Sequence, residues 1–289
     1  MGMLRREYIV RAGAAILFCC AIRVVAAQKI GIAYCDVDHL YDTVPALFYD
    51  DSDYTPQGRL KWNSERYRRK IAQVAALADS LTLPIVALWG VENEAVVRDI
   101  SAACRNDYSY LHRTLNSLDG MDFALLYFPD IFAPHYVEPG RRYLYVEGTL
   151  RRPAGRGHPR NRVRVDTLGL LLCSETRMAR WVAADLREER PGARLVALGR
   201  LPAEGLESCG LRDAHARQEH LGRGNIRSNG GWRMRDRAAV DTAWRIDRGE
   251  IYIRRFLLDA AAIQPLATYD RRRYRGGTSY ALPVYVYLE

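Results

Sequence analysis

The stretch from Tyr274 to Leu288 reads Y-R-G-G-T-S-Y-A-L-P-V-Y-V-Y-L and combines two local patterns. Gly276 and Gly277 mark a loop, since paired glycines interrupt regular structure. Within Leu282 to Leu288, residues 284–287 alternate valine with tyrosine, residue types that fit a pleated, half-buried surface. We therefore expect the chain to end in a glycine-rich loop that leads into a buried strand.

Upstream of this stretch, short apolar runs alternate with helical patterns. Thr176–Glu189 is predicted as a helix, with Met178, Trp181, Val182 and Leu186 as its inner stripe. A second helix is expected to begin at Asn63 or Ser64, residue types that cap helix starts. Other predicted segments are the strands Lys29–Cys35, Pro84–Trp89, Asp122–Phe128, Asp166–Cys173 and Val240–Ile246, the loop Arg151–Asn161 and an irregular region at 205–238. Because no Ser/Pro-rich linker divides these segments, we expect one α/β domain over residues 28–289.

The first 27 residues have the pattern of a cleaved signal peptide. Three arginines precede the apolar run Ala12–Ile22, and Val25-Ala26-Ala27 supplies small residues for cleavage. The run is too short to span a bilayer as a helix, so no transmembrane span is expected. A lipoprotein signal with Cys19 or Cys20 is the less favoured alternative, because bulky side chains precede both cysteines. The sequence thus predicts a secreted or periplasmic protein.

The chain is basic, and its charge is carried by arginine. The formal net charge is +9, and the densest cluster is Arg271, Arg272, Arg273 and Arg275. Such a chain could approach nucleic acid or an anionic membrane surface. Arginines scattered over the whole surface are the favoured interpretation, because no run of five like charges occurs. Nucleic acid is therefore a partner class that the sequence allows without favouring.

Four cysteines follow the predicted leader, and their spacing excludes a C-x-x-C motif. Cys35, Cys104, Cys173 and Cys209 are too far apart in sequence for a zinc or redox motif. An exported protein could oxidise a pair of them, whereas buried free thiols are equally consistent with strand positions. The sequence leaves their pairing open.

Several landmarks occur in an order that resembles one known family. They are Y-C-D-V-D-H-L-Y-D at 34–42, V-E-N at 91–93, G-M-D-F-A-L-L-Y at 120–127 and the terminal loop and strand. Over about residues 29–288 the chain is similar to the endonuclease/exonuclease/phosphatase superfamily, whose fold resembles that of deoxyribonuclease I. The resemblance implies a four-layer α/β sandwich, with two packed mixed β-sheets flanked by helices.

The same resemblance implies where a metal-dependent active site would lie. Members hold Mg²⁺ or Mn²⁺ with carboxylate and amide oxygens, and use a His and Asp residues on the scissile phosphate. At the corresponding positions this chain has Asp36, Gly90, Ser174, Arg200, Pro202, Tyr280 and Ala281. Asp36 alone retains a carboxylate there. The metal glutamate falls on Gly90, the D-x-N pair on Arg200 and Pro202, and the terminal Asp-His pair on Tyr280 and Ala281.

These replacements favour a pseudoenzyme without catalytic residues, metal ligands or a cofactor. Its cleft would serve an unidentified ligand or protein partner, with Trp89, Glu92, Asn93 and Asp241 as cleft-lining or retained polar residues. Asp241 resembles the Asp of the family's I-D-x-I strand. The alternative is an active Mg²⁺- or Mn²⁺-dependent phosphodiesterase or phosphatase with displaced ligands. Three or more carboxylate or His side chains converging in the cleft would favour that alternative.

Overall fold

The computed structural model describes residues 29–115, 117–153 and 163–289, and most of their strands belong to two six-stranded sheets. The first sheet has the order β13-β18-β1-β2-β4-β3, with the long strand β1 (Ile30–Leu40) inside it. β1 runs parallel to β2 and antiparallel to β18, so the sheet is mixed. The other strands of this sheet are β2 (Ile85–Val91), β3 (Ser109–Arg113), β4 (Asp122–Tyr127), β13 (Ile246–Ile251) and β18 (Val284–Leu288).

The second sheet has the order β5-β6-β7-β8-β12-β9 and is also mixed, because β7 and β8 are parallel. Its strands are β5 (Phe132–Pro139), β6 (Tyr143–Pro153), β7 (Val163–Cys173), β8 (Arg194–Gly199), β9 (Leu211–Asp213) and β12 (Arg237–Asp241). Three short two-stranded hairpins complete the strands: β10 (Ile226–Ser228) with β11 (Gly231–Arg233), β14 (Leu258–Asp259) with β15 (Gln264–Pro265), and β16 (Tyr269–Asp270) with β17 (Arg273–Tyr274).

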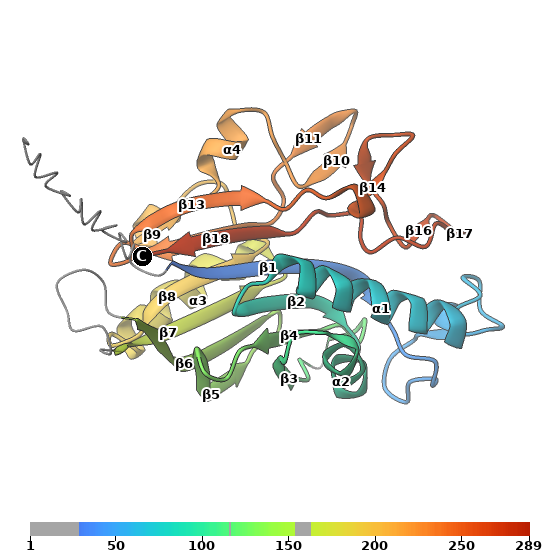
Figure 1. Cartoon of the computed structure of the whole chain (residues 1–289), viewed down its shortest axis with the longest axis horizontal. Coiled ribbons are helices and arrows are strands. Elements are labelled where there is room, and N and C mark those ends of the chain that lie inside the picture. Colours follow the sequence, from blue (N-terminus) through green and yellow to red (C-terminus); the bar gives the residue numbers. More distant parts are fainter. Residues whose placement is uncertain (1–28, 116, 154–162) are drawn as a thin grey trace, which may run out of the picture.

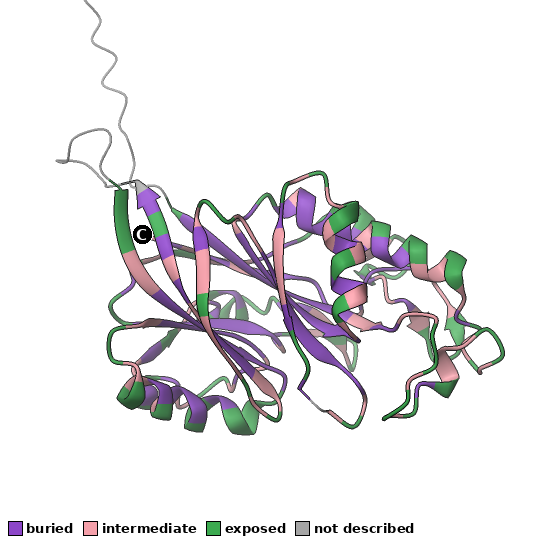
Figure 2. Cartoon of the chain, turned by 90° about the horizontal axis from the view of Figure 1, so that it is seen from below, coloured by how far each residue is buried: buried purple, intermediate pink, exposed green. Residues whose placement is uncertain are grey.

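Helices cover the outer faces of both sheets (Figure 1). α1 (Ser64–Leu81) and α2 (Glu94–Ala103) pack on the first sheet, and α3 (Thr176–Glu189) packs on β7 and β8 of the second. α4 (Ala216–His220) is a single short turn. The side chains of Asn63 and Asn93 cap α1 and α2, accepting from Arg66 N and Val96 N, each at 3.0 Å. The predicted four-layer α/β sandwich is confirmed, and Figure 2 shows its buried strands between helices with exposed outer faces.

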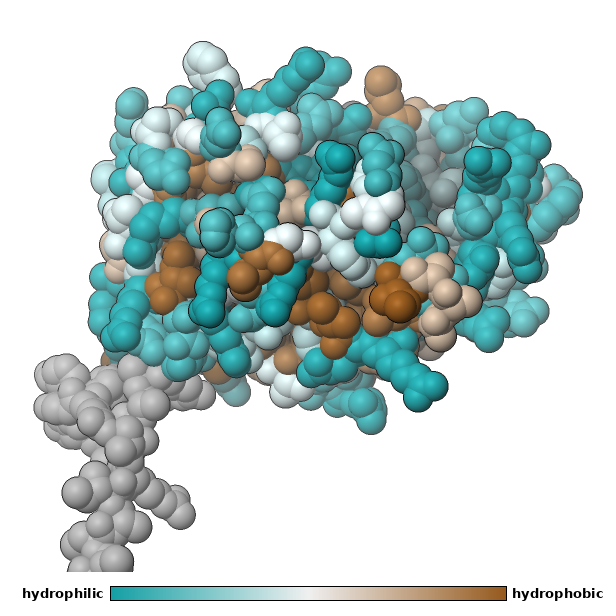
Figure 3. Space-filling view, turned by 90° about the horizontal axis from the view of Figure 1, so that it is seen from above, coloured by the Kyte–Doolittle hydropathy of each residue, from teal (hydrophilic) through white to brown (hydrophobic). Residues whose placement is uncertain are grey.

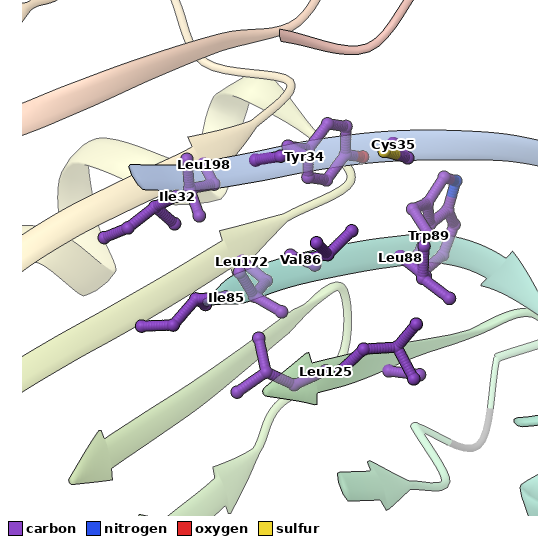
Figure 4. Close-up of a cluster of buried hydrophobic side chains, with 14 of the residues drawn as sticks. Ile32, Tyr34, Cys35, Ile85, Val86, Leu88, Trp89, Leu125, Leu172 and Leu198 are labelled. Carbon is purple, nitrogen blue, oxygen red and sulfur yellow. The ribbon is translucent and has the colours of Figure 1, made fainter. Parts of the chain in front are cut away.

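The main core lies between the two sheets, because both sheets turn an apolar face inward. Ile32 and Ile85 of the first sheet meet Leu172 and Leu198 of the second (Figure 4). β1 is buried along most of its length, since helices cover its other side. All four cysteines after the predicted leader are free. Within the described residues, no helix is long and apolar enough to cross a membrane.

Several sequence predictions need correction. The bounds of α3 match the prediction, but Met178 and Trp181 are exposed, and Ala179 and Ala183 pack inward with Val182 and Leu186. The strand predicted at 240–246 is instead the end of β12, a turn at 242–245 and the start of β13. The Asp241 side chain accepts from Ala243 N at 2.7 Å, and its backbone carbonyl accepts from Trp244 N at 2.9 Å. The irregular region at 205–238 contains β9, α4, β10 and β11.

Two further predictions fall partly or wholly outside the described residues. β6 continues through Pro153, so the loop predicted at 151–161 begins later than expected. The rest of that loop, at 154–161, and the leader at 1–27 lie outside the described residues. Their predicted roles stay predictions.

Candidate functional site

The candidate site lies at one end of the sandwich, where β1, β2 and β8 end and β12 and β18 begin. The pairing of β1 with β2 shifts register between Asp36 and Leu40. Within this shift, Asp38 and His39 adopt left-handed backbone angles, with φ of 55° and 52°. Non-glycine residues rarely adopt this conformation, and such residues cluster at functional sites. The shift places the Asp36 carboxylate at the floor of the candidate site.

The carboxylate of Asp36 is buried and fully engaged by neighbouring donors. Its Oδ2 lies 2.8 Å from Arg235 Nη2, 3.1 Å from the Tyr280 hydroxyl and 3.7 Å from Arg200 Nη2. Its Oδ1 accepts from the backbone N of Asp38 at 2.9 Å. Charge-assisted hydrogen bonds of this kind are stronger than neutral ones. The only carboxylate among the family-equivalent positions therefore already has a cationic partner.

Arg235 is the central residue that sequence reasoning missed. Its Nη2 lies 2.5 Å from Asp236 Oδ2, so a single guanidinium links two buried carboxylates. The Asn225 amide holds this arrangement: Nδ2 donates to Asp236 Oδ2 at 2.8 Å, and Oδ1 accepts from Arg235 N at 2.9 Å. The Arg235 guanidinium also lies 4.6 Å from the centre of the Tyr280 ring.

The electrostatics of this cluster hold Arg235 in its charged form. Burial opposes the charge, yet Asp236 and Asp36 together raise the pKa of Arg235 above its usual value. Burial is also the largest cause that raises the pKa of Tyr280, to about 12, so its hydroxyl stays a neutral donor. The signal available in the sequence was the R-D pair at 235–236, directly before the buried strand β12. The pair fell in the region predicted to be irregular, and β12 begins directly after it. Burying such a charged pair is costly unless other groups pair with it.

Arg200 reaches the cluster because the chain turns sharply after β8. Gly199 has φ of +112°, and an added Cβ would lie 2.2 Å from the carbonyl oxygen of Cys173. Only glycine fits this close approach without strain. The turn lets Arg200 N donate to the same carbonyl at 2.9 Å, and Arg200 Nη2 donate to the Tyr280 hydroxyl at 3.2 Å.

The residues present do not fit a divalent cation. Gly90 faces Asp36, since a Cβ added there would lie 3.8 Å from Asp36 Oδ1, but it has no side chain to donate. Arg200, Pro202 and Ala281 likewise supply no side-chain oxygen. Among the described residues, no group of three or more His, Cys, Asp or Glu side chains could hold a metal. Mg²⁺ needs oxygen ligands, and the available carboxylates face guanidinium groups instead.

A pocket of about 380 Å³ opens beside the cluster, lined by Ser174, Glu175, Thr176, Arg177 and Arg200. Ser174 and Arg200, predicted from different motifs, therefore line one cavity. Ser174 itself is buried, and its hydroxyl donates to the carbonyl oxygen of Arg142 at 3.2 Å. Its role there is to hold the loop after β7 against the β5–β6 turn.

Of the predicted cleft-lining residues, Glu92 and Asn93 line a pocket of about 320 Å³, which is separate from the one beside the cluster, and both also have structural contacts. Trp89 is buried against Phe123, with ring centres 4.5 Å apart, and so lies beneath the cleft instead of lining it. Asn93 caps α2 and also donates to Asp42 Oδ2 at 2.9 Å. Glu92 accepts from Asp42 N at 2.5 Å and from the Tyr49 hydroxyl at 2.7 Å. Burial is the main cause that raises the pKa of Glu92 to about 7.

The prediction for Asp241 is wrong in its placement. Asp241 lies at the far end of β12, paired with Arg187 of α3, whereas the site is at the start of that strand. The register shows this directly, because Arg237 pairs with Gly199 beside the cluster and Val240 pairs with Val196 further away. Asp236, and not Asp241, is the carboxylate that β12 brings to the site.

Two packed mixed sheets with outer helices, and a polar cluster at the strand ends, define a protein of the deoxyribonuclease-I-like class. A family model described as Endonuclease/Exonuclease/phosphatase family matches residues 31–150. Over these residues the chain is similar to the endonuclease/exonuclease/phosphatase family, and its cluster stands where the resemblance implies carboxylates.

Solved structures share the fold at low sequence identity. An endonuclease/exonuclease/phosphatase family protein from Bacteroides thetaiotaomicron has a TM-score of 0.57 and 11% identity, over 91% of this chain and 98% of that one. A mannosyl-6-phosphatase from the same species has a TM-score of 0.56 and 11% identity, over 90% and 99% of the two chains. Humanized D. rerio TDP2 has a TM-score of 0.53 and 15% identity, over 90% and 99%. No curated protein sequence matches the chain.

Proposed function

We propose that this chain is an exported, non-catalytic member of the superfamily whose former active-site cleft serves binding. The observation that supports this most is the Asp36 carboxylate, which Arg235, Arg200 and Tyr280 engage where a metal would need it free. Phosphodiester hydrolysis in this family depends on a metal and on fixed donors that stabilise developing charge. A fixed guanidinium supplies positive charge but cannot activate a bound water as a metal does.

The pocket beside the cluster supports the binding part of the proposal. Its volume, about 380 Å³, lies within the usual range for small-molecule sites. Arg177 and Arg200 supply guanidinium donors, and Thr176 supplies a hydroxyl at the start of α3. These groups suit a ligand with a carboxylate or phosphate group. A thermal-shift screen tests whether the pocket binds such ligands. It uses carboxylates, inorganic phosphate and sugar phosphates, and compares the wild type with Arg200→Met.

Catalysis is tested with purified protein and generic phosphomonoester and phosphodiester substrates. We expect no Mg²⁺- or Mn²⁺-dependent turnover above the buffer rate, and no heat of binding for either ion at sub-millimolar concentration. An active member of the superfamily with its carboxylates intact, assayed in parallel, shows that the conditions support turnover. Metal-dependent turnover that Asp36→Asn abolishes would reject the proposal in favour of an active hydrolase with displaced ligands.

Export is tested separately from catalysis. The predicted cleavage after Ala27 leaves Gln28 as the first residue of the mature chain. Mass spectrometry of protein recovered from the periplasm or the culture medium should find this N-terminus. Recovery of the uncleaved chain in the cytosol alone would contradict export and leave the question of catalysis untouched.

A further inference from the structure

Residues 252–275 leave both sheets between β13 and β18 and form a separate surface, which we call the 252–275 surface. It consists of a short 3-10 turn at Arg255–Leu257 and the hairpins β14–β15 and β16–β17. Figure 1 shows both hairpins at the same end of the molecule, beyond the ends of the sheets. Arg275 Nη2 lies 2.5 Å from Asp259 Oδ2, and Leu266 N donates to Leu257 O at 2.8 Å. These contacts tie the turn and the hairpins into one unit.

This surface exposes large apolar side chains. Ile253, Phe256 and Ile263 are 52%, 50% and 69% exposed, and the three alanines before Ile263 are exposed as well. Ile263 has φ of +45°, a conformation that a β-branched residue rarely adopts. The β14–β15 turn therefore presents an isoleucine to solvent at a strained position, and such strain clusters at functional sites. Over the whole face seen from above, hydrophobic groups are scattered among hydrophilic side chains (Figure 3).

The same segment also carries positive charge without an ion-pair partner among the described residues. The segment 252–275 contains six arginines and two aspartates, a net charge of +4, and Arg275 already neutralises Asp259. Arg255 and the three arginines at 271–273 are exposed and have no ion-pair partner among the described residues. This accounts for the densest arginine cluster of the sequence, which the candidate site does not use.

We propose that the 252–275 surface binds the face of a lipid bilayer that contains anionic lipids. Exposed apolar side chains flanked by arginines are the combination that inserts into the headgroup region and is attracted to negative lipid. The apolar groups lie on projecting turns and hairpin tips, which suit a soft, flat bilayer. A nucleic acid would pair with the arginines but leave Ile253 and Ile263 in water, so the apolar groups favour the bilayer.

The test is co-sedimentation of the full-length protein with vesicles. One set contains phosphatidylglycerol and phosphatidylcholine at about one to three, and the other phosphatidylcholine alone. We expect the protein to bind the anionic vesicles. Added salt near 1 M should lower the affinity at least tenfold, because charges are then screened within about 3 Å. The variant Phe256→Ser/Ile263→Ser should lose about tenfold or more in affinity. In the variant Arg271→Gln/Arg272→Gln/Arg273→Gln, the affinity for anionic vesicles should fall about fivefold for each arginine removed.

Matched controls separate this surface from the rest of the chain, including its N-terminal segment. Leu47→Ser/Phe48→Ser removes two apolar side chains that are 89% and 95% exposed elsewhere. Arg98→Gln/Arg113→Gln/Arg217→Gln removes the same charge from three other exposed positions. Both controls should bind vesicles within about twofold of the wild type. Circular dichroism and the melting temperature of every variant confirm that it is folded.

Three results would overturn the proposal. The first is equal binding to both kinds of vesicle, and the second is an equal loss of affinity in the surface variants and their controls. The third is that the protein binds no vesicles but binds a single-stranded oligonucleotide, and that the arginine variant weakens this binding. The last result would assign the surface to nucleic acid instead. None of these outcomes depends on the cleft, so the experiment tests the 252–275 surface separately from the proposed function.

Discussion

The Nη2 atom of Arg235 lies 2.8 Å from Oδ2 of Asp36, although 199 positions separate the two residues in sequence. The same nitrogen lies 2.5 Å from Asp236, so two buried carboxylates share one cation. Pairing of this kind offsets the cost of removing the charges from water. In this arrangement the guanidinium of Arg235 supplies positive charge to the buried carboxylate of Asp36.

Replacing Arg235 should destabilise the protein strongly. In Arg235→Met the carboxylates of Asp36 and Asp236 lose their common partner inside the protein. Removal of one member of a buried ion pair costs about 3–5 kcal/mol. Urea denaturation measures the loss, and Arg255→Met, at an exposed position, should change the free energy of unfolding by less than about 0.5 kcal/mol. A loss below about 1 kcal/mol for Arg235→Met would mean that the cluster is not coupled to folding.

A divalent cation should partly replace the missing guanidinium. Arg235→Ala leaves the two carboxylates facing a space that no side chain fills, next to the Asn225 amide. Mg²⁺ or Ca²⁺ at ten times its dissociation constant would then add about 1.4 kcal/mol of stability. The melting temperature of the variant should rise with either ion, while that of the wild type stays constant. Potassium chloride at equal ionic strength serves as the control, and an equal rise with that salt would contradict the prediction.

Gly199→Ala should destabilise the protein, because the added Cβ has no room and the backbone angle φ suits only glycine. The added Cβ would lie 2.2 Å from the carbonyl oxygen of Cys173, and φ is +112°. We expect a loss of about 3 kcal/mol in the free energy of unfolding. Gly192→Ala is the matched control, since a Cβ there meets nothing within 4 Å and the substitution should be close to neutral. Similar melting temperatures for both variants would show that the loop after β8 relaxes freely.

Glu92 should make stability depend on pH. Its pKa is raised from 4.5 to about 7, chiefly by burial. Because the folded state holds the proton more tightly than the unfolded state, the contribution of Glu92 is fully present below about pH 4.5 and is lost as pH rises through about 7. The free energy of unfolding of the wild type, relative to Glu92→Gln, should therefore fall over this range. Parallel pH profiles of the two proteins in urea titrations would contradict the assignment.

Much of the fold could be predicted from local patterns. The helix at Thr176–Glu189 has its predicted bounds, and the cap at Asn63 is one of the two residues expected. Local prediction was wrong where burial depends on distant elements. Trp181 is 71% exposed despite its place in the apolar stripe, because small alanines let α3 pack closely on β7 and β8. The turn at Asp241 likewise depends on side-chain hydrogen bonds that hydrophobic periodicity does not reveal.

The sequence by itself determined the superfamily fold and the absence of carboxylates at Gly90, Arg200, Pro202, Tyr280 and Ala281, because motif order and residue type are local information. Only the tertiary structure decided what replaces them. Arg235 meets Asp36 through the start of β12 and the end of β1, which lie in different sheets and join only when the sandwich packs. Hydrophobic periodicity in either segment does not reveal this contact. The packing of the two sheets brings the partners together, and the spacing of residues along the chain does not.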